Sequence, residues 1–133
     1  MTCDRVWPSH FPTDCPSGPH DGRSGPYYRL VSDAKAPVDI EFLPHAERPD
    51  YVPSGGRGAQ CSDCALSVFD RIESAQNFVA ARPAIHAKLP VRIDAVGEHG
   101  VIHPDGALYA GHFLWWLPQG MTFLAFYRNS HHV

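Results

Sequence analysis

The sequence has few charged residues and lacks both a basic run and a long apolar run. Charged side chains make up 19% of the 133 residues, and the formal net charge is −3. Lys and Arg are scattered, so no basic surface that would hold a nucleic-acid backbone is expected. No run of about 18 apolar residues is present to span a membrane, and the first residues have no apolar stretch typical of a secretion signal. We therefore expect a cytoplasmic protein with neither nucleic-acid nor membrane partners.

Proline and glycine are abundant instead. The chain has 13 Pro and 11 Gly, a composition that favours strands and turns over long helices. Its length suits one hydrophobic core, so we expect a single α+β domain. Residues 1–26 contain five Pro and no apolar periodicity, and they are predicted to form an irregular N-terminal arm. The domain itself is predicted to span 27–133.

Local patterns predict several strands and one main helix. The segments with the composition of strands are 27–31, 65–69, 91–95, 101–102, 113–117 and 121–127. The main helix is predicted to follow Asp70, whose side chain would cap it with Glu73 three positions on, and to end before Pro83. A short helix is expected within 37–47. Turn-forming residues fill 48–60, and a loop of this length is a candidate lid over a pocket.

The four cysteines suggest a metal site. Cys61 and Cys64 have the spacing at which two thiolates hold one tetrahedral zinc ion. The arm offers further ligands, namely Cys3, Cys15, His10 and His20. A site of four cysteines would fasten the arm to the domain and make the protein a zinc-stapled interaction module. The alternative is a set of unrelated thiols, and disulfides are not expected because a cytoplasmic compartment keeps cysteines reduced.

His112 differs from the other histidines in its sequence context. It follows Gly111 and precedes the apolar segment 113–117, and a polar ring next to a buried segment calls for a specific explanation. One reason is catalysis, because a histidine can act as an acid or a base near neutral pH. The other is a hydrogen-bonded histidine at the end of a strand. Both interpretations remain open from the sequence.

Three short motifs, in their order along the chain, resemble the ADP-ribosyltransferase fold. In that family an early strand carries Arg or His, and here Tyr-Tyr-Arg-Leu-Val contains Arg29. A second strand carries Ser and is followed by a helix with an Ala-x-x-Phe pattern, to which Ser67, Ala75 and Phe78 correspond. A late turn is similar to Leu-Pro-Gln-Gly at 117–120. The same segments also resemble small bacterial proteins of unassigned function with YRLV, GLSVF and GHxTLW-like motifs.

The resemblance covers residues 27–127 and implies a small split sheet whose cleft binds NAD. It implies an NAD- or ADP-ribose-using enzyme, such as a bacterial effector or toxin that acts on a protein target. Arg29 would hold the diphosphate and Ser67 would orient a ribose. The residues expected at the cofactor are Arg29, Tyr28, Tyr109 and Trp115.

One departure from the family affects the expected chemistry. The family has Glu just before the late turn, and Leu114 stands there in this sequence. Leucine cannot stabilise the positive charge that develops as nicotinamide leaves. His112, with Ser67, is then the candidate catalyst of a transferase or NAD glycohydrolase. The alternative is a non-catalytic module that binds a nucleotide or a partner protein through the same cleft.

Overall fold

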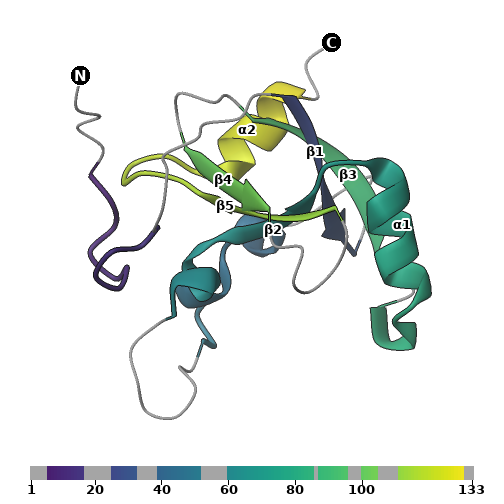
Figure 1. Ribbon diagram of the computed structural model, residues 1–133, viewed down its shortest axis with the longest axis horizontal. Coiled ribbons are helices and arrows are strands. Elements are labelled where there is room, and N and C mark those ends of the chain that lie inside the picture. Colours follow the sequence, from purple (N-terminus) through teal and green to yellow (C-terminus); the bar gives the residue numbers. More distant parts are fainter. Residues whose placement is uncertain are drawn as a thin grey trace.

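A computed structural model describes residues 6–16, 25–32, 39–51, 60–85, 87–95, 100–104 and 111–130. They form an α+β domain built on one five-stranded antiparallel sheet (Figure 1), which confirms the predicted class. The strands are β1 (Gly25–Val31), β2 (Leu66–Phe69), β3 (Leu89–Ala95), β4 (Val101–Pro104) and β5 (His112–Trp116). Their order across the sheet is β3-β1-β2-β5-β4.

The sheet is continuous but narrow at its middle. β1 pairs with β3 along its whole length, from Gly25 opposite Ala95 to Val31 opposite Leu89. By contrast, the register between β1 and β2 consists of one pair, Tyr28 opposite Phe69. The two small sheets implied by the family resemblance are therefore joined here into a single sheet.

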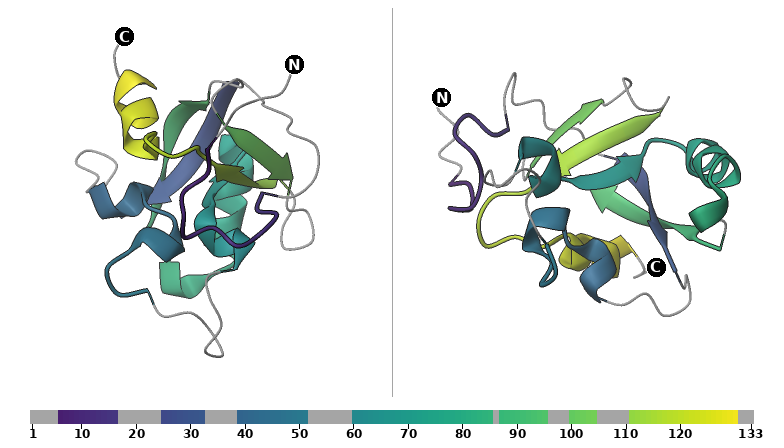
Figure 2. Two further views of the ribbon diagram at one scale, coloured as in Figure 1. Left: turned by 90° about the vertical axis from the view of Figure 1, so that its left-hand side faces the viewer. Right: turned by 90° about the horizontal axis from the view of Figure 1, so that it is seen from below.

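Two helices cover opposite faces of this sheet (Figures 1 and 2). Because side chains alternate along a strand, Val31 and its neighbour Leu30 point to different faces. Val31 belongs to the main core, which α2 (Phe123–Ser130) completes with Phe123. Leu30 packs in a smaller cluster with Ala75 of α1 (Ile72–Ala80). Among the described helices, none has the length and apolarity required to cross a bilayer.

The predicted helices form with different ends. α1 is present, but its N-cap residue is Arg71 and no side-chain hydrogen bond caps it, so the predicted cap by Asp70 is wrong. The short helix expected within 37–47 is two 3-10 helices, η1 (Asp39–Phe42) and η2 (His45–Glu47). Pro44 separates them, because its ring cannot continue a helix. Two more 3-10 helices are η4 (Cys61–Cys64) and η5 (Pro83–Ile85).

The segment 121–127, expected as the last strand, is largely helical. α2 begins after Thr122, whose Oγ1 accepts a hydrogen bond of 3.3 Å from the backbone N–H of Ala125. Phe123 and Tyr127 lie four positions apart and are both buried, and Tyr127 stacks on Phe42 of η1 at 4.7 Å between ring centroids. The segment is apolar at spacings that suit either a strand or a helix. In the fold, Phe123 and Tyr127 both pack into the main core from one side of the helix.

Residues 6–16 of the arm are irregular, as expected, and lie at the end of the molecule away from α1 (Figures 1 and 2). Trp7 and Phe11 stack on each other at 5.9 Å and pack against a cluster that contains Cys64 and Trp116. The backbone N–H of Gln119 donates a 2.8 Å hydrogen bond to the carbonyl of Val6. Aromatic packing and backbone pairing therefore order this part of the arm.

A disulfide, and not zinc, fastens the arm to the domain. Cys15 and Cys61 form an S–S bond of 2.09 Å. Their sulfurs are thus unavailable as thiolate ligands, and within the described ranges no group of three His, Cys, Asp or Glu side chains is placed to hold a metal ion. Among the described cysteines Cys64 is free, and burial raises its pKa to about 11, which also disfavours a thiolate. The zinc prediction is wrong, and so is the expectation of reduced Cys15 and Cys61; Cys3 and His20 lie outside the described residues.

Candidate functional site

A pocket lies beside the point where β1 and β2 meet. Its volume is about 210 Å³, and we call it the basic pocket. Its polar lining consists of Arg29, Arg48, Lys88, His45, His112 and Ser67. Its apolar lining consists of Leu30, Phe69, Phe78 and Ile85. Residues from both strands, from the η2 segment and from the region after α1 therefore meet here.

Arg29 connects three parts of the chain at this pocket. Its Nε donates a 2.9 Å hydrogen bond to the carbonyl of Glu41, and its Nη1 donates one of 3.0 Å to the carbonyl of Ser67. Alternation places Arg29 on the face of its register partner Val91. Ser67 lies on the other face, with Phe69. The long side chain of Arg29 reaches the carbonyl of Ser67 in spite of this, because it crosses to β2 next to the single β1–β2 pair.

The charges in the pocket are of one sign. Arg29, Arg48 and Lys88 carry positive charge at neutral pH, and none of the described lining residues is Asp or Glu. Burial, followed by the positive charge of Arg48, lowers the pKa of Arg29 to about 10, although the charge of Glu41 opposes this. Arg29 is still protonated at neutral pH. Three cations that repel one another form a site that an anion would stabilise.

His112 forms one wall of the basic pocket. It is 6% exposed, and its ring lies 5.3 Å from that of Phe69 and nearly parallel to that of Phe78 at 6.5 Å. The Arg82 guanidinium lies 3.6 Å from the ring centroid of Phe78. Phe78 therefore contacts both a histidine ring and a cation, and these contacts hold the side of the pocket that α1 supplies.

The backbone before His112 is tied to the end of β2. Gly111 has φ +79°, and its carbonyl accepts a 3.1 Å hydrogen bond from the N–H of Asp70. A Cβ at this position would collide with the Ser74 side chain. Glycine is therefore required both by the left-handed backbone and by the close approach of α1. This junction places His112 opposite Phe69 in the register of β2 and β5.

Three of the residues singled out in the sequence come together in the basic pocket. Arg29, Ser67 and His112 all line it, and Ser67 and His112 project from the same face of neighbouring strands. Leu114 lies directly opposite Ser67 in that register. An apolar side chain thus stands next to the proposed ribose contact, at the position where the resemblance would have Glu.

The other predicted cofactor contacts lie elsewhere. Trp115 is fully buried in the main core, edge-to-face with Phe123 at 4.9 Å, and so cannot stack on a ligand base. Tyr28 packs with the cluster beneath α1 and does not line the basic pocket. Tyr109 lies outside the described residues. The expectation for Trp115 is corrected for a physical reason: β5 is covered on both faces, and its large aromatic side chains complete the core.

Sequence reasoning missed Arg48, Lys88 and His45. Arg48 was assigned to a turn-rich loop, and Lys88 precedes a strand, so neither belongs to a recognisable motif. Their common location depends on how the η2 segment and the end of the α1 region pack around β1. Local sequence patterns do not predict such contacts between segments that are far apart in the chain.

Searches of family models, of curated proteins and of solved structures find no match to this chain. The functional argument therefore rests on the chemistry of the pocket itself. The similarity to ADP-ribosyltransferases stays a prediction from three short motifs, and the projection of Arg29 and Ser67 from opposite faces of the sheet argues against it. What the structure adds is the position of Arg29, Ser67 and His112 around one cationic cavity.

Proposed function

We propose that the basic pocket binds the phosphate groups of a nucleotide, with ADP-ribose as the representative of the ligand class. The observation that carries this proposal is the group of Arg29, Arg48 and Lys88 around a cavity whose described lining contains no carboxylate. The protein as a whole is acidic, so this concentration of positive charge is local. Burial, and after it the positive charge of Arg48, lowers the pKa of Arg29, and the negative charge of a bound anion would oppose both effects.

The arginines are positioned before a ligand arrives. The two hydrogen bonds of Arg29 to backbone carbonyls fix the plane of its guanidinium and leave its other N–H donors available for a ligand. Arg48 is oriented in the same way, by a 3.2 Å hydrogen bond from its Nε to the carbonyl of Leu43. A guanidinium held in this manner loses little side-chain entropy on binding, and its geometry matches phosphate oxygens.

The size and the walls of the pocket favour part of a nucleotide over the whole. Its volume of about 210 Å³ is below the roughly 300–1,000 Å³ of sites that enclose complete ligands. A diphosphate with an adjoining ribose fits this limit better than a dinucleotide. Ser67 offers a hydroxyl to the sugar, while Phe69 and Phe78 supply an apolar wall.

Binding is better supported than turnover. Leu114 faces Ser67, and the described part of the lining has no carboxylate to stabilise a developing positive charge. Cleavage of the bound nucleotide would therefore depend on His112, whose buried ring lies beside Phe69 and Phe78. The sequence-based prediction of a catalytic His112 remains a second step beyond the binding proposal.

Calorimetry with ADP-ribose, inorganic pyrophosphate and adenosine tests the proposal. We expect ADP-ribose and pyrophosphate to bind, and adenosine to bind at least about tenfold more weakly than ADP-ribose because it lacks the charge. Arg48→Gln and Lys88→Ala should each weaken ADP-ribose binding by about tenfold, the effect of losing roughly 1.4 kcal/mol.

The matched control is Arg92→Gln, because Arg92 is exposed and pairs with Asp94 at 2.8 Å on the surface of β3. This substitution removes the same charge without touching the pocket and should leave affinity unchanged. An affinity that is equal in Arg48→Gln and in the unmodified protein would refute the proposal, as would the failure of both phosphate ligands to bind. Nicotinamide release from NAD, measured on the same samples, would show whether turnover accompanies binding.

A further inference from the structure

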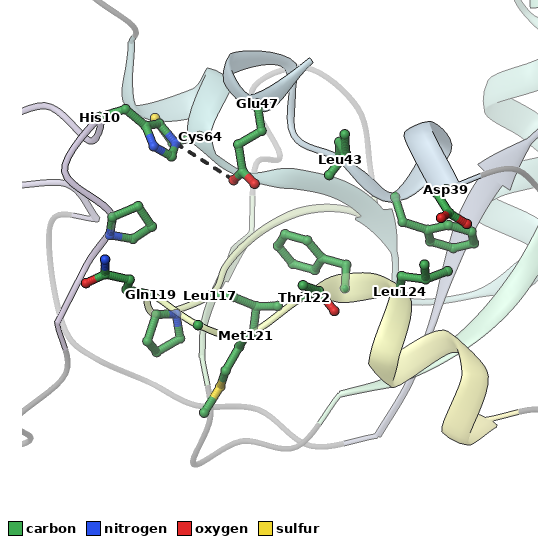
Figure 3. A pocket seen from close by; sticks show the side chains of 15 residues that line it. His10, Asp39, Leu43, Glu47, Cys64, Leu117, Gln119, Met121, Thr122 and Leu124 are labelled. Atoms are coloured by element: carbon green, nitrogen blue, oxygen red, sulfur yellow. Dashed lines mark ion pairs between the residues drawn. The ribbon is translucent and has the colours of Figure 1, made fainter. Parts of the chain in front are cut away.

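A second cavity lies between the arm, the η1–η2 segment and the turn that leads from β5 into α2 (Figure 3). We call it the arm pocket. Its volume is about 330 Å³, within the range of small-molecule sites. Most of its lining is apolar and includes Phe42, Leu43, Leu117, Met121, Phe123 and Leu124. It shares no lining residue with the basic pocket.

The charged groups of the arm pocket are mainly acidic. Asp39 and Glu47 line it, and neither Lys nor Arg is among its described lining residues. The basic side chain among the lining residues that the structure describes is His10, whose Nε2 lies 3.8 Å from Oε2 of Glu47. Figure 3 shows Glu47 and Asp39 on either side of Leu43, with Met121 across the cavity. The carboxylate of Glu47 therefore lies beside apolar side chains, and its partner His10, 3.8 Å away, is partly exposed.

We infer that the arm pocket binds a small molecule with an apolar body and a cationic amine head. The amine would pair with Glu47, and the negative charge of Asp39 would add to the attraction. The apolar body would contact Leu43 and Met121, the latter being 41% exposed and thus able to gain burial. An anionic ligand would meet two carboxylates in this pocket and is disfavoured.

Glu47 is the more important carboxylate of the two. Burial raises its pKa, and the nearby His10 opposes this shift, so Glu47 is partly desolvated without a strong counter-ion. An ammonium group placed against it would supply that counter-ion. Asp39 is exposed at the start of η1 and keeps more of its hydration.

The arm forms one wall of this pocket through Pro8 and His10. It is held in place by the Cys15–Cys61 disulfide and by the hydrogen bond between Gln119 N–H and the Val6 carbonyl. The wall that Pro8 and His10 form is therefore present only while the arm is docked. The affinity for a ligand should therefore depend on the position of the arm as well as on the acidic lining residues.

The probes are 3-phenylpropylamine, the neutral 3-phenylpropanol and the anionic 3-phenylpropanoate. Binding is followed by the methyl resonance of Met121, which is one of two methionines and can be assigned by Met121→Leu. We expect the amine to shift this resonance and to bind about fivefold tighter than the alcohol, as for a partly exposed ion pair. The carboxylate should bind more weakly than both.

Glu47→Gln removes the negative charge of this side chain with little change in its size, and so tests whether that charge causes the preference for the amine. It should abolish the preference for the amine while changing the affinity for the alcohol by less than about twofold. Glu73→Gln, on the exposed side of α1, is the matched control and should preserve the preference. The inference is overturned if the alcohol or the carboxylate binds as tightly as the amine, if Glu47→Gln keeps the preference, or if millimolar amine leaves the Met121 resonance in place.

Discussion

The basic pocket and the arm pocket share one short segment of the chain but have charges of opposite sign. Asp39 and Glu47 face the arm pocket, whereas His45 and Arg48 face the basic pocket. The segment is two 3-10 helices interrupted by Pro44, so successive side chains are distributed around it and not along one stripe. An irregular segment of this kind can contribute side chains to both neighbouring cavities. Its acidic residues line the arm pocket and its basic residues line the basic pocket.

The two pockets also differ in what holds them. The basic pocket is built on paired strands and on Arg29, which bridges the β1 and β2 regions to η1. The arm pocket depends on a segment outside the sheet that is fastened by a disulfide. This contrast implies that the arm pocket can be lost while the basic pocket survives.

The largest effect is expected from removal of the disulfide. The double variant Cys15→Ser, Cys61→Ser opens a link across a sequence separation of 46 and should lower the free energy of unfolding by about 4 kcal/mol in the chain-entropy treatment. Urea denaturation measures this change. Amine binding at the arm pocket should be lost, and pyrophosphate binding at the basic pocket should persist under native conditions. Simultaneous loss of both sites in a folded variant would show that the pockets are not independent.

A smaller loss of stability is expected for Arg29→Lys, which keeps the positive charge but removes the planar guanidinium. Arg29→Lys cannot reproduce both hydrogen bonds to the carbonyls of Glu41 and Ser67, so unfolding should become easier by about 2 kcal/mol. Pyrophosphate affinity should fall about tenfold, and amine affinity should not change. Arg92→Lys on the exposed surface of β3 is the control. Unchanged stability in Arg29→Lys would contradict the bridging role.

The pKa of Arg29 predicts a pH dependence for the basic pocket. Because this pKa is lowered to about 10, Arg29 loses its proton as the pH rises through that value, and anion affinity should fall with it. The expected loss approaches about tenfold between roughly pH 9 and pH 11. Calorimetry with pyrophosphate across this pH range, on the unmodified protein and on Arg29→Lys, measures the change. Affinity that stays constant to about pH 11 would argue against Arg29 as the anion contact.

These pockets show which features were accessible from the sequence. All five strands, β1 to β5, were predicted because alternation and β-branched or aromatic content act locally. α2 was missed because Phe123 and its neighbours are apolar at spacings that suit a strand as well as a helix. Arg29, Ser67 and His112 were identified by motif, yet their meeting depends on strand register, which no local pattern determines.

The rest of the site depends on contacts between distant segments. Arg48 and Lys88 reach the basic pocket from outside any motif, and the arm pocket needs His10 beside Glu47 across the fold. The spacing of Cys61 and Cys64 suggested zinc, but the partner of Cys61 is Cys15, and spacing cannot distinguish a thiolate ligand from half of a disulfide. Trp115 was expected at the cofactor, and its burial in the core depends on tertiary packing that the local sequence does not encode.

The smallest expected effect is the change in amine affinity when His10 is replaced. Its direction shows whether His10 competes with the amine for Glu47 or contacts the ligand. The side chains of His10 and Glu47 are each more than a third exposed and lie 3.8 Å apart, so their pair should contribute less than about 0.5 kcal/mol to stability. His10→Gln should therefore leave the free energy of unfolding nearly unchanged. If Glu47 is the amine contact, removing its competing partner should strengthen amine binding by about twofold. Titration of the Met121 resonance with 3-phenylpropylamine, in His10→Gln and in the unmodified protein, measures this gain. Weaker amine binding in His10→Gln would instead identify His10 as a wall that the ligand needs, and would place the cation away from Glu47.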